Sequence, residues 1–152
     1  MIGDGYTPSS KLWLFVISKP LSLDAEVELR NELTSFANSW EAHGKPLQAS
    51  FEMNGQLLVV CVNAATEPAS GCSIDKLYAL LQGFGHRHAL DFLDRQWLIT
   101  KDGLCLHAMH NRGNLSQLKG KEIADLSIAR LDKWLSDGWV QVEDSWVAKN
   151  LI

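Results

Sequence analysis

The sequence Leu57-Leu58-Val59-Val60-Cys61-Val62 decides how we expect this chain to fold. A continuous apolar run of this length, rich in valine, is typical of a strand that is buried on both faces. Asn54-Gly55 precedes the run and favours a type I′ hairpin turn, because both residues tolerate the positive φ that this turn needs at its two central positions. Residues 47–53 alternate between apolar and polar side chains, so we expect them to form the other arm of the hairpin, with one wet face.

A second apolar run, residues 12–17, predicts another strand with two buried faces. An amphipathic helix is expected between this strand and the hairpin, ending near His43-Gly44, where glycine can take the left-handed cap. A second helix is expected after the hairpin, from about residue 72, with Gly83 and Gly85 ending it. Residues 97–100 then predict a short fourth strand.

This order of elements, β-α-β-β-α-β, predicts an α+β protein with a ferredoxin-like antiparallel sheet. In that arrangement the first and third strands are central and the second and fourth strands are edges. The hydrophobic pattern agrees independently, because the two continuous apolar runs fall on the strands predicted to be central, and the alternating strand and the short strand on the edges.

The two central strands are apolar on both faces, whereas a plain ferredoxin-like sheet leaves one face open. We therefore expect either the C-terminal third of the chain or another subunit to cover the second face. The prediction is a single domain, 1–152, with a βαββαβ core at 1–103 and an extension at 104–152 packed on it, and a homodimer as a possible partner arrangement. Trp134, Trp139 and Trp146 are expected to pack in the core or in an interface.

Composition excludes some classes of function. The 152 residues carry a formal charge of -4, which argues against a nucleic-acid partner, because phosphate contacts need clustered lysine and arginine. Three cysteines without a CxxC pair argue for a reducing compartment. The apolar runs are strand-sized, so no membrane segment is expected and the cytoplasm is the predicted location.

The candidate site lies where the third strand meets the second helix, at Ser70-Gly71-Cys72-Ser73-Ile74-Asp75. In the predicted topology this segment and the Trp40–Pro46 segment lie at the same end of the sheet, and Asp102, after the fourth strand, is expected there too. The first turn of a helix favours thiolate over thiol, so Cys72 with His43 as its base would form a minimal catalytic pair. The remaining candidates would bind a small-molecule ligand: Trp40, Gly44, Ser70, Gly71, Ser73 and Asp75.

A purely structural alternative assigns the same residues ordinary roles. Cys72 would be a small buried apolar side chain, Ser73 and Asp75 would cap the helix, and His43-Gly44 would end the first helix. Metal binding is not expected either, because the spacing of Cys105, His107 and His110 matches no closed zinc pattern. The chain has no phosphate-binding loop of the G-x-x-x-x-G-K-[ST] type, and no cofactor is predicted.

With these motifs in view, the chain resembles an uncharacterised family of small bacterial proteins typical of Bacteroidetes-type genomes. The resemblance rests on four segments: W-x-x-H-G-x-P-L from Trp40, S-G-C-S-I-D from Ser70, F-x-D-R from Phe92 and Ser145-Trp146. Such sequences sometimes carry a transporter-ATPase label, which the missing phosphate loop contradicts. The resemblance implies no activity, but it marks the same two loops as the topology does.

Three hypotheses for function follow from the sequence. The first is a small cytoplasmic ligand-binding or interaction and regulatory module, with its site between the His43 and Cys72 loops. The second is a thiol-dependent enzyme that uses the Cys72/His43 pair. The third is a purely structural motif in which these residues are caps and core.

Overall fold

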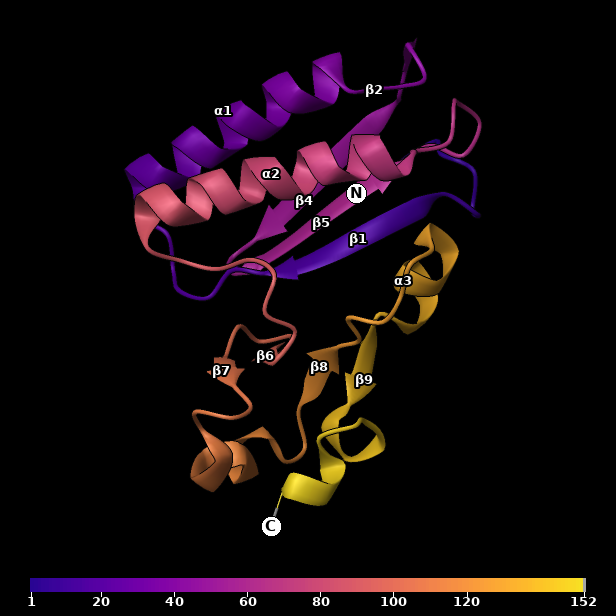
Figure 1. Cartoon of the computed structure of the whole chain (residues 1–152). Helices are drawn as coiled ribbons and strands as arrows, with labels where there is room; N and C mark the ends of the chain where they lie inside the picture. The colour runs from indigo at the N-terminus through magenta and orange to yellow at the C-terminus, as the bar shows by residue number, and fades with distance from the viewer. Residues whose placement is uncertain (152) are drawn as a thin grey trace.

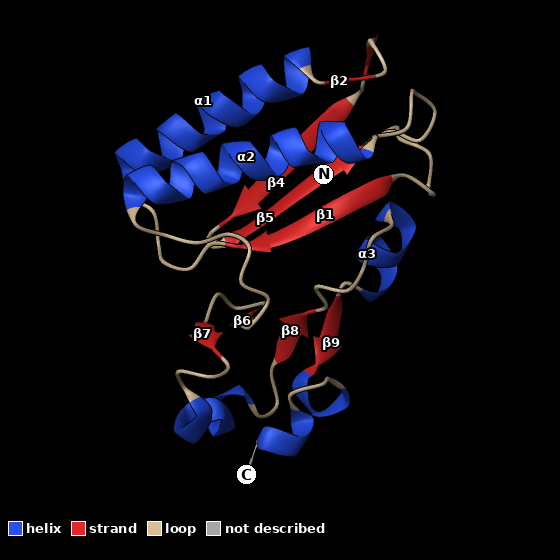
Figure 2. Ribbon diagram, viewed as in Figure 1, coloured by secondary structure: helices blue, strands red, loops and turns tan. Residues whose placement is uncertain are grey.

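The structure is a computed structural model that describes residues 1–151, and it is a mixed α+β protein (Figures 1 and 2). Two long helices lie side by side on one face of an antiparallel sheet, and the C-terminal part lies beyond the other face. The helices and strands are β1 Lys11–Val16, α1 Leu23–Ser39, β2 Glu41–Ala42, β3 Lys45–Pro46, β4 Ala49–Asn54, β5 Leu57–Val62, α2 Gly71–His88, β6 Trp97–Ile99, β7 Cys105–His107, β8 Glu122–Ala124, α3 Leu131–Asp137 and β9 Trp139–Gln141.

The main sheet has three strands in the order β1-β5-β4. β5 is central and buried along its whole length, as its sequence predicted. The hairpin is also present, but its turn is one residue further along than expected: Asn54 pairs with Leu57, and Gly55-Gln56 are the central residues. Gly55 has a φ of 58° and Asn54 is not in the positive-φ region, so the turn belongs to the class with glycine at the first central position.

The fourth strand does not join this sheet. β6 pairs with β7 in a separate two-stranded sheet, through a turn in which Gly103 has a φ of 98°. Other groups occupy the outer edge of β1: Ala129 accepts a hydrogen bond from the Leu12 amide at 3.1 Å, and the Arg95 guanidinium donates to the Leu14 carbonyl at 2.6 Å. β1 is therefore an edge strand, and the expectation that it would be central was wrong.

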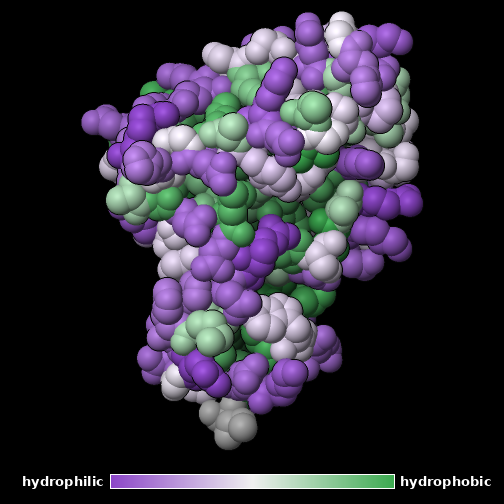
Figure 3. Space-filling model, in the orientation of Figure 1, coloured by the Kyte–Doolittle hydropathy of each residue, from purple (hydrophilic) through white to green (hydrophobic). Residues whose placement is uncertain are grey.

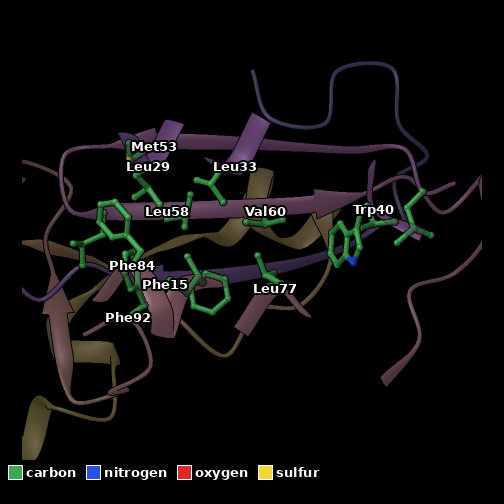
Figure 4. Packing of buried hydrophobic residues seen from close by; sticks show 14 of the residues in the cluster. Phe15, Leu29, Leu33, Trp40, Met53, Leu58, Val60, Leu77, Phe84 and Phe92 are labelled. Atoms are coloured by element: carbon green, nitrogen blue, oxygen red, sulfur yellow. The ribbon is translucent and has the colours of Figure 1, made fainter. Parts of the chain in front are cut away.

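The helix-facing side of the sheet carries the main core. Side chains from alternate positions of β1, β4 and β5 meet the apolar stripes of α1 and α2 (Figure 4), including Phe15, Leu29, Val60, Leu77 and Phe84. α2 continues past Gly83 and Gly85 to His88, and Ala89 caps it in the left-handed conformation. Its last turn is linked to α1 by an ion pair of 2.6 Å between Arg87 and Glu32, and the expectation that the two glycines end the helix was wrong.

α1 is shorter than predicted, because it ends at Ser39 and not at His43-Gly44. His43 and Gly44 have φ values of 54° and 75°, and they form the two-residue turn of the β2–β3 hairpin. Positive φ at both central residues is what a type I′ turn needs.

The second face of the sheet is covered within the same chain. Leu12, Leu14 and Val59 on this face pack against Leu131 and Trp134 of the C-terminal part. A third apolar cluster, which includes Leu98, Leu118 and Val142, holds the C-terminal part together. The argument for a second subunit therefore loses its basis, and the homodimer and the single-domain organisation stay predictions.

Candidate functional site

The two loops singled out by the sequence do meet. The Trp40 side chain is 2% exposed, and its indole Nε1 donates a hydrogen bond of 2.8 Å to the carbonyl of Ser73. An ion pair of 3.7 Å between Lys45 and Glu67 links the β2–β3 hairpin to the segment that leads into α2. The His43 hairpin and the start of α2 thus form one packed corner of the molecule.

Ser70 and Ser73 form hydrogen bonds with each other. The Ser70 hydroxyl accepts from the Ser73 amide at 3.1 Å, the Ser73 hydroxyl accepts from the Ser70 amide at 2.7 Å, and it donates to the Ser70 carbonyl at 2.7 Å. This reciprocal arrangement is a capping box, which satisfies amides at the helix start. Since Ser73 and Trp40 are also buried, these three residues fit the structural alternative and not a ligand-binding role.

The rest of the predicted site faces solvent. His43, Gly44, Gly71, Cys72 and Asp75 are exposed, which corrects the alternative in which Cys72 is a buried apolar side chain. Within residues 1–151, no hydrogen bond joins the Cys72 thiol to the His43 imidazole. Cys61 is buried and Cys105 is half-buried, and burial raises the pKa of each of these two thiols to about 11.

Asp102 does not come to this corner. Its carboxylate binds Lys121 and Thr100, and the hydrogen bonds from those two residues lower the pKa of Asp102 to about 2. Its neighbours Lys101 and Gly103 line a cavity together with Asn54, which stands at the other end of the sheet from the His43 hairpin. The expectation failed because it placed β6 in the main sheet.

His107 is the most enclosed of the histidines considered as metal ligands, at 5% exposed. Its Nε2 lies 2.8 Å from the Asp94 carboxylate, and its Nδ1 accepts from the amides of Met109 and His110, both at 3.2 Å. Both ring nitrogens are therefore in use, and in the part of the chain that the structure describes no three candidate ligands gather around a metal position. The pKa of Asp94 is lowered, first by the hydrogen bond from the Gln96 amide and then by His107.

An open groove of about 740 Å³ runs beside the outer edge of β1, between α2 and residues 126–129. Trp13, Phe15 and Tyr78 supply apolar wall, Asp75 lies at its rim, and Arg95 crosses it to reach the Leu14 carbonyl. Figure 3 shows apolar surface gathered at the narrow middle of the molecule, between the sheet layer and the C-terminal part.

A more enclosed cavity of about 530 Å³ lies between the second face of the sheet and the C-terminal part. Leu57 and Val59 of β5 form its sheet wall, and Ile99, Trp134 and Trp139 form the opposite wall. No motif marked this cavity, because its walls come from strands, a helix and turns that are far apart in the sequence. The available signal in the sequence is the concentration of tryptophan near the C-terminal end, which we interpret there mainly as core or interface packing.

Gly138 positions the two tryptophans. It stands between α3 and β9, and a Cβ atom there would lie 2.5 Å from both the Trp134 carbonyl and the Trp134 ring. Only glycine leaves room for the chain to pass directly from the helix into the strand. The two indole rings consequently lie 5.7 Å apart between centroids, tilted by 48°, on the wall of the cavity.

The charged groups on this cavity differ in how they are neutralised. Glu26 is paired with Arg30 at 3.0 Å, and Lys101 with Glu122 at 3.5 Å. Glu52 instead accepts from the Ile2 amide at 3.0 Å and from the Asn54 side-chain amide at 2.8 Å, two donors without charge. Among the residues that the structure describes, Glu52 has no cationic partner.

No family model, curated protein or solved structure matches the chain. None of the helices in residues 1–151 combines the length and the apolar character that crossing a bilayer requires. The case for a function therefore rests on the geometry of the two loops, the groove and the cavity.

Proposed function

We propose that the protein is a small-molecule-binding module whose site is the 530 Å³ cavity between the sheet and the C-terminal part. Ligand sites in proteins are usually concave, of about 300 to 1,000 Å³, with apolar and aromatic walls and a few polar groups that orient the ligand. The cavity has this size and combines apolar and aromatic wall residues, Leu57, Val59, Ile99, Trp134 and Trp139, with polar residues such as Glu52 and Asn54, and that observation carries the proposal.

The proposal keeps the ligand-binding hypothesis from the sequence but moves its site. At the predicted corner, Trp40, Ser70 and Ser73 are used in packing and capping, which leaves only the exposed residues such as His43, Cys72 and Asp75 to hold a ligand. The order β1-β5-β4 with two helices on one face also supports a ferredoxin-like core in which the fourth strand, β6, is not part of the main sheet. Because β6 pairs with β7 and not with β1, the C-terminal part can form the second wall of the cavity.

A neutral fluorescent probe tests the site. N-phenyl-1-naphthylamine fluoresces in apolar surroundings, and we expect saturable binding at one site per chain. Trp139→Ala should weaken this binding about tenfold or more. The variant removes part of an apolar wall, and the lost burial of apolar surface lowers the binding free energy by about 1.5 to 3 kcal/mol. Trp146→Ala is the matched control, since Trp146 is 54% exposed and does not line the cavity. Absence of saturable binding, or equal loss in both variants, would refute the proposal.

The thiol-enzyme hypothesis has one observation in its favour. Cys72 is exposed in the first turn of α2, where the helix dipole favours an anion. Catalysis would also need a base within hydrogen-bond reach, and Cys72 and His43 share no hydrogen bond in residues 1–151. We therefore place binding before catalysis. A Cys72→Ser variant that retains full probe binding is the expected result.

A further inference from the structure

Glu52 on the wall of the cavity indicates which ligands it would take. β4 alternates so that Ala49, Phe51 and Met53 pack under the helices, which puts Glu52 on the opposite face of the sheet, level with Val59 of β5. Its carboxylate is fixed from two sides, by the Ile2 amide at 3.0 Å and by Asn54 at 2.8 Å. A carboxylate can accept about four hydrogen bonds, so Glu52 keeps capacity for a ligand.

Of the charged residues that line the cavity, Glu52 is the one that no other described residue pairs with an opposite charge. Arg30 neutralises Glu26, and Glu122 lies 3.5 Å from Lys101, whose side chain is 63% exposed. A carboxylate that is half-buried and paired only with neutral donors favours a positive group that approaches from the cavity. An anionic ligand would instead meet Glu52 and would have to displace Glu122 from Lys101.

The aromatic wall favours the same kind of ligand. The faces of indole rings attract cations, and the combination of aromatic rings with a carboxylate is a recurrent way of binding organic ammonium groups. Trp134 and Trp139 both line the cavity, and the cation-π contact found in residues 1–151, Arg87 over Phe84, lies on the helix layer. The two indoles are thus not already occupied by a protein cation.

We propose that this cavity binds an organic cation with an apolar body, whose positive group is held by Glu52 and whose body packs on Trp134, Trp139 and the β5 wall. The inference rests on the proposed function, because it assigns the chemistry of the ligand to the same cavity. The chemistry required is an ammonium or a similar cation attached to a ring or a hydrocarbon chain.

Three probes with one benzyl body separate the possibilities. Benzyltrimethylammonium, benzyl alcohol and phenylmethanesulfonate are titrated into the whole protein, with binding measured by displacement of N-phenyl-1-naphthylamine and by calorimetry. We expect the cation to bind about tenfold more tightly than the alcohol, and the sulfonate to bind weakest. Glu52→Gln keeps an oxygen acceptor for the Ile2 amide but removes the charge, so it should lower the affinity for the cation about tenfold and leave the alcohol unchanged.

Glu41→Gln is the matched control, because it changes the net charge equally but lies on β2, at the other end of the sheet. A cation that binds no better than the alcohol, or a preference that survives Glu52→Gln, would overturn this inference while leaving the binding site intact. Failure of all three probes, together with failure of the fluorescent probe, would overturn the proposed function as well. The comparison of the three probes on the unaltered protein decides the matter even where the Glu52→Gln variant folds poorly.

Discussion

Replacing Trp40 with phenylalanine should loosen the corner where the β2–β3 hairpin meets the start of α2. Trp40 is 2% exposed, its Nε1 donates to the Ser73 carbonyl at 2.8 Å, and its ring lies between Phe36 and Trp13, at 4.8 and 6.2 Å between centroids. Phenylalanine keeps an aromatic ring in this place but has no hydrogen-bond donor. The variant therefore removes the one direct hydrogen bond that joins, within residues 1–151, the two segments that the sequence marked as a site.

The size of the effect follows from these contacts. Losing a neutral hydrogen bond costs about 1 kcal/mol, and losing the part of the buried indole that phenylalanine lacks costs about 1 to 2 kcal/mol more. We expect the free energy of unfolding to fall by about 2 to 3 kcal/mol, which for a chain of this size lowers Tm by about 4 to 12 °C.

Urea unfolding followed by circular dichroism measures this change, and the m value should stay constant. Trp146→Phe is the control, because Trp146 is 54% exposed and its change should stay within about 0.5 kcal/mol. Binding of the neutral fluorescent probe should not change in Trp40→Phe, because the cavity lies on the other face of the sheet. A loss below about 0.5 kcal/mol would refute the conclusion that Trp40 has a structural role, and a loss of probe binding would show that the two sites are connected.

Two further outcomes are expected. Iodoacetamide should label Cys72 in the folded protein and leave Cys61 and Cys105 unlabelled, because Cys72 is exposed, whereas burial raises the pKa of the other two thiols to about 11. Peptide mapping by mass spectrometry checks this, and labelling of Cys61 before unfolding would contradict the packing of β5. The second outcome is a pH dependence of stability that comes from Asp102. The pKa of Asp102 is lowered to about 2 in the folded protein, so its interaction with Lys121 and Thr100 stabilises the fold above about pH 4, and this stabilisation is lost as the pH falls towards 2. The difference in stability between the unaltered protein and Asp102→Asn should accordingly shrink over that range, and a difference that stays constant with pH would contradict the assignment.

Much of the sheet could be predicted because single residues carry strong local signals. β5 is apolar at every position and is buried at every position, and the alternation along β4 assigns each side chain to the correct face. Glycine marks both tight turns, yet it does not say which kind of turn it serves. Gly44 was expected to end a helix and instead closes a hairpin, because both structures use a residue with positive φ and only the pairing of Glu41 with Pro46 distinguishes them.

The pairing partner of the fourth strand could not be predicted from the local sequence. Trp97–Ile99 is three residues long, and nothing in three residues says whether the partner is β1 or the segment just after Gly103. The outcome depends on distant groups, since Arg95 and Ala129 occupy the edge of β1. Local pairing of β6 with β7 also closes a shorter loop, which costs less chain entropy than a longer one.

The pairing of β6 outside the main sheet also explains why the binding cavity was not predicted, and it connects the fold to the proposed function. Because β6 leaves the sheet, the second face of β5 is covered by α3 and β9, which meet at Gly138 with two bulky indoles that do not fill the space in front of Leu57 and Val59. The sheet and the C-terminal part each form one wall, so a ligand that fills the cavity contacts both. Such a ligand binds the folded protein and not the unfolded chain, and it should stabilise the fold by RT ln(1 + [L]/Kd), about 2.7 kcal/mol at a concentration one hundred times Kd. A ligand that occupied only the exposed corner at Cys72 would not bridge these two layers, so protection from hydrogen exchange centred on the amides of Ile99, Thr100 and Trp139, which line the cavity, identifies the cavity as the site.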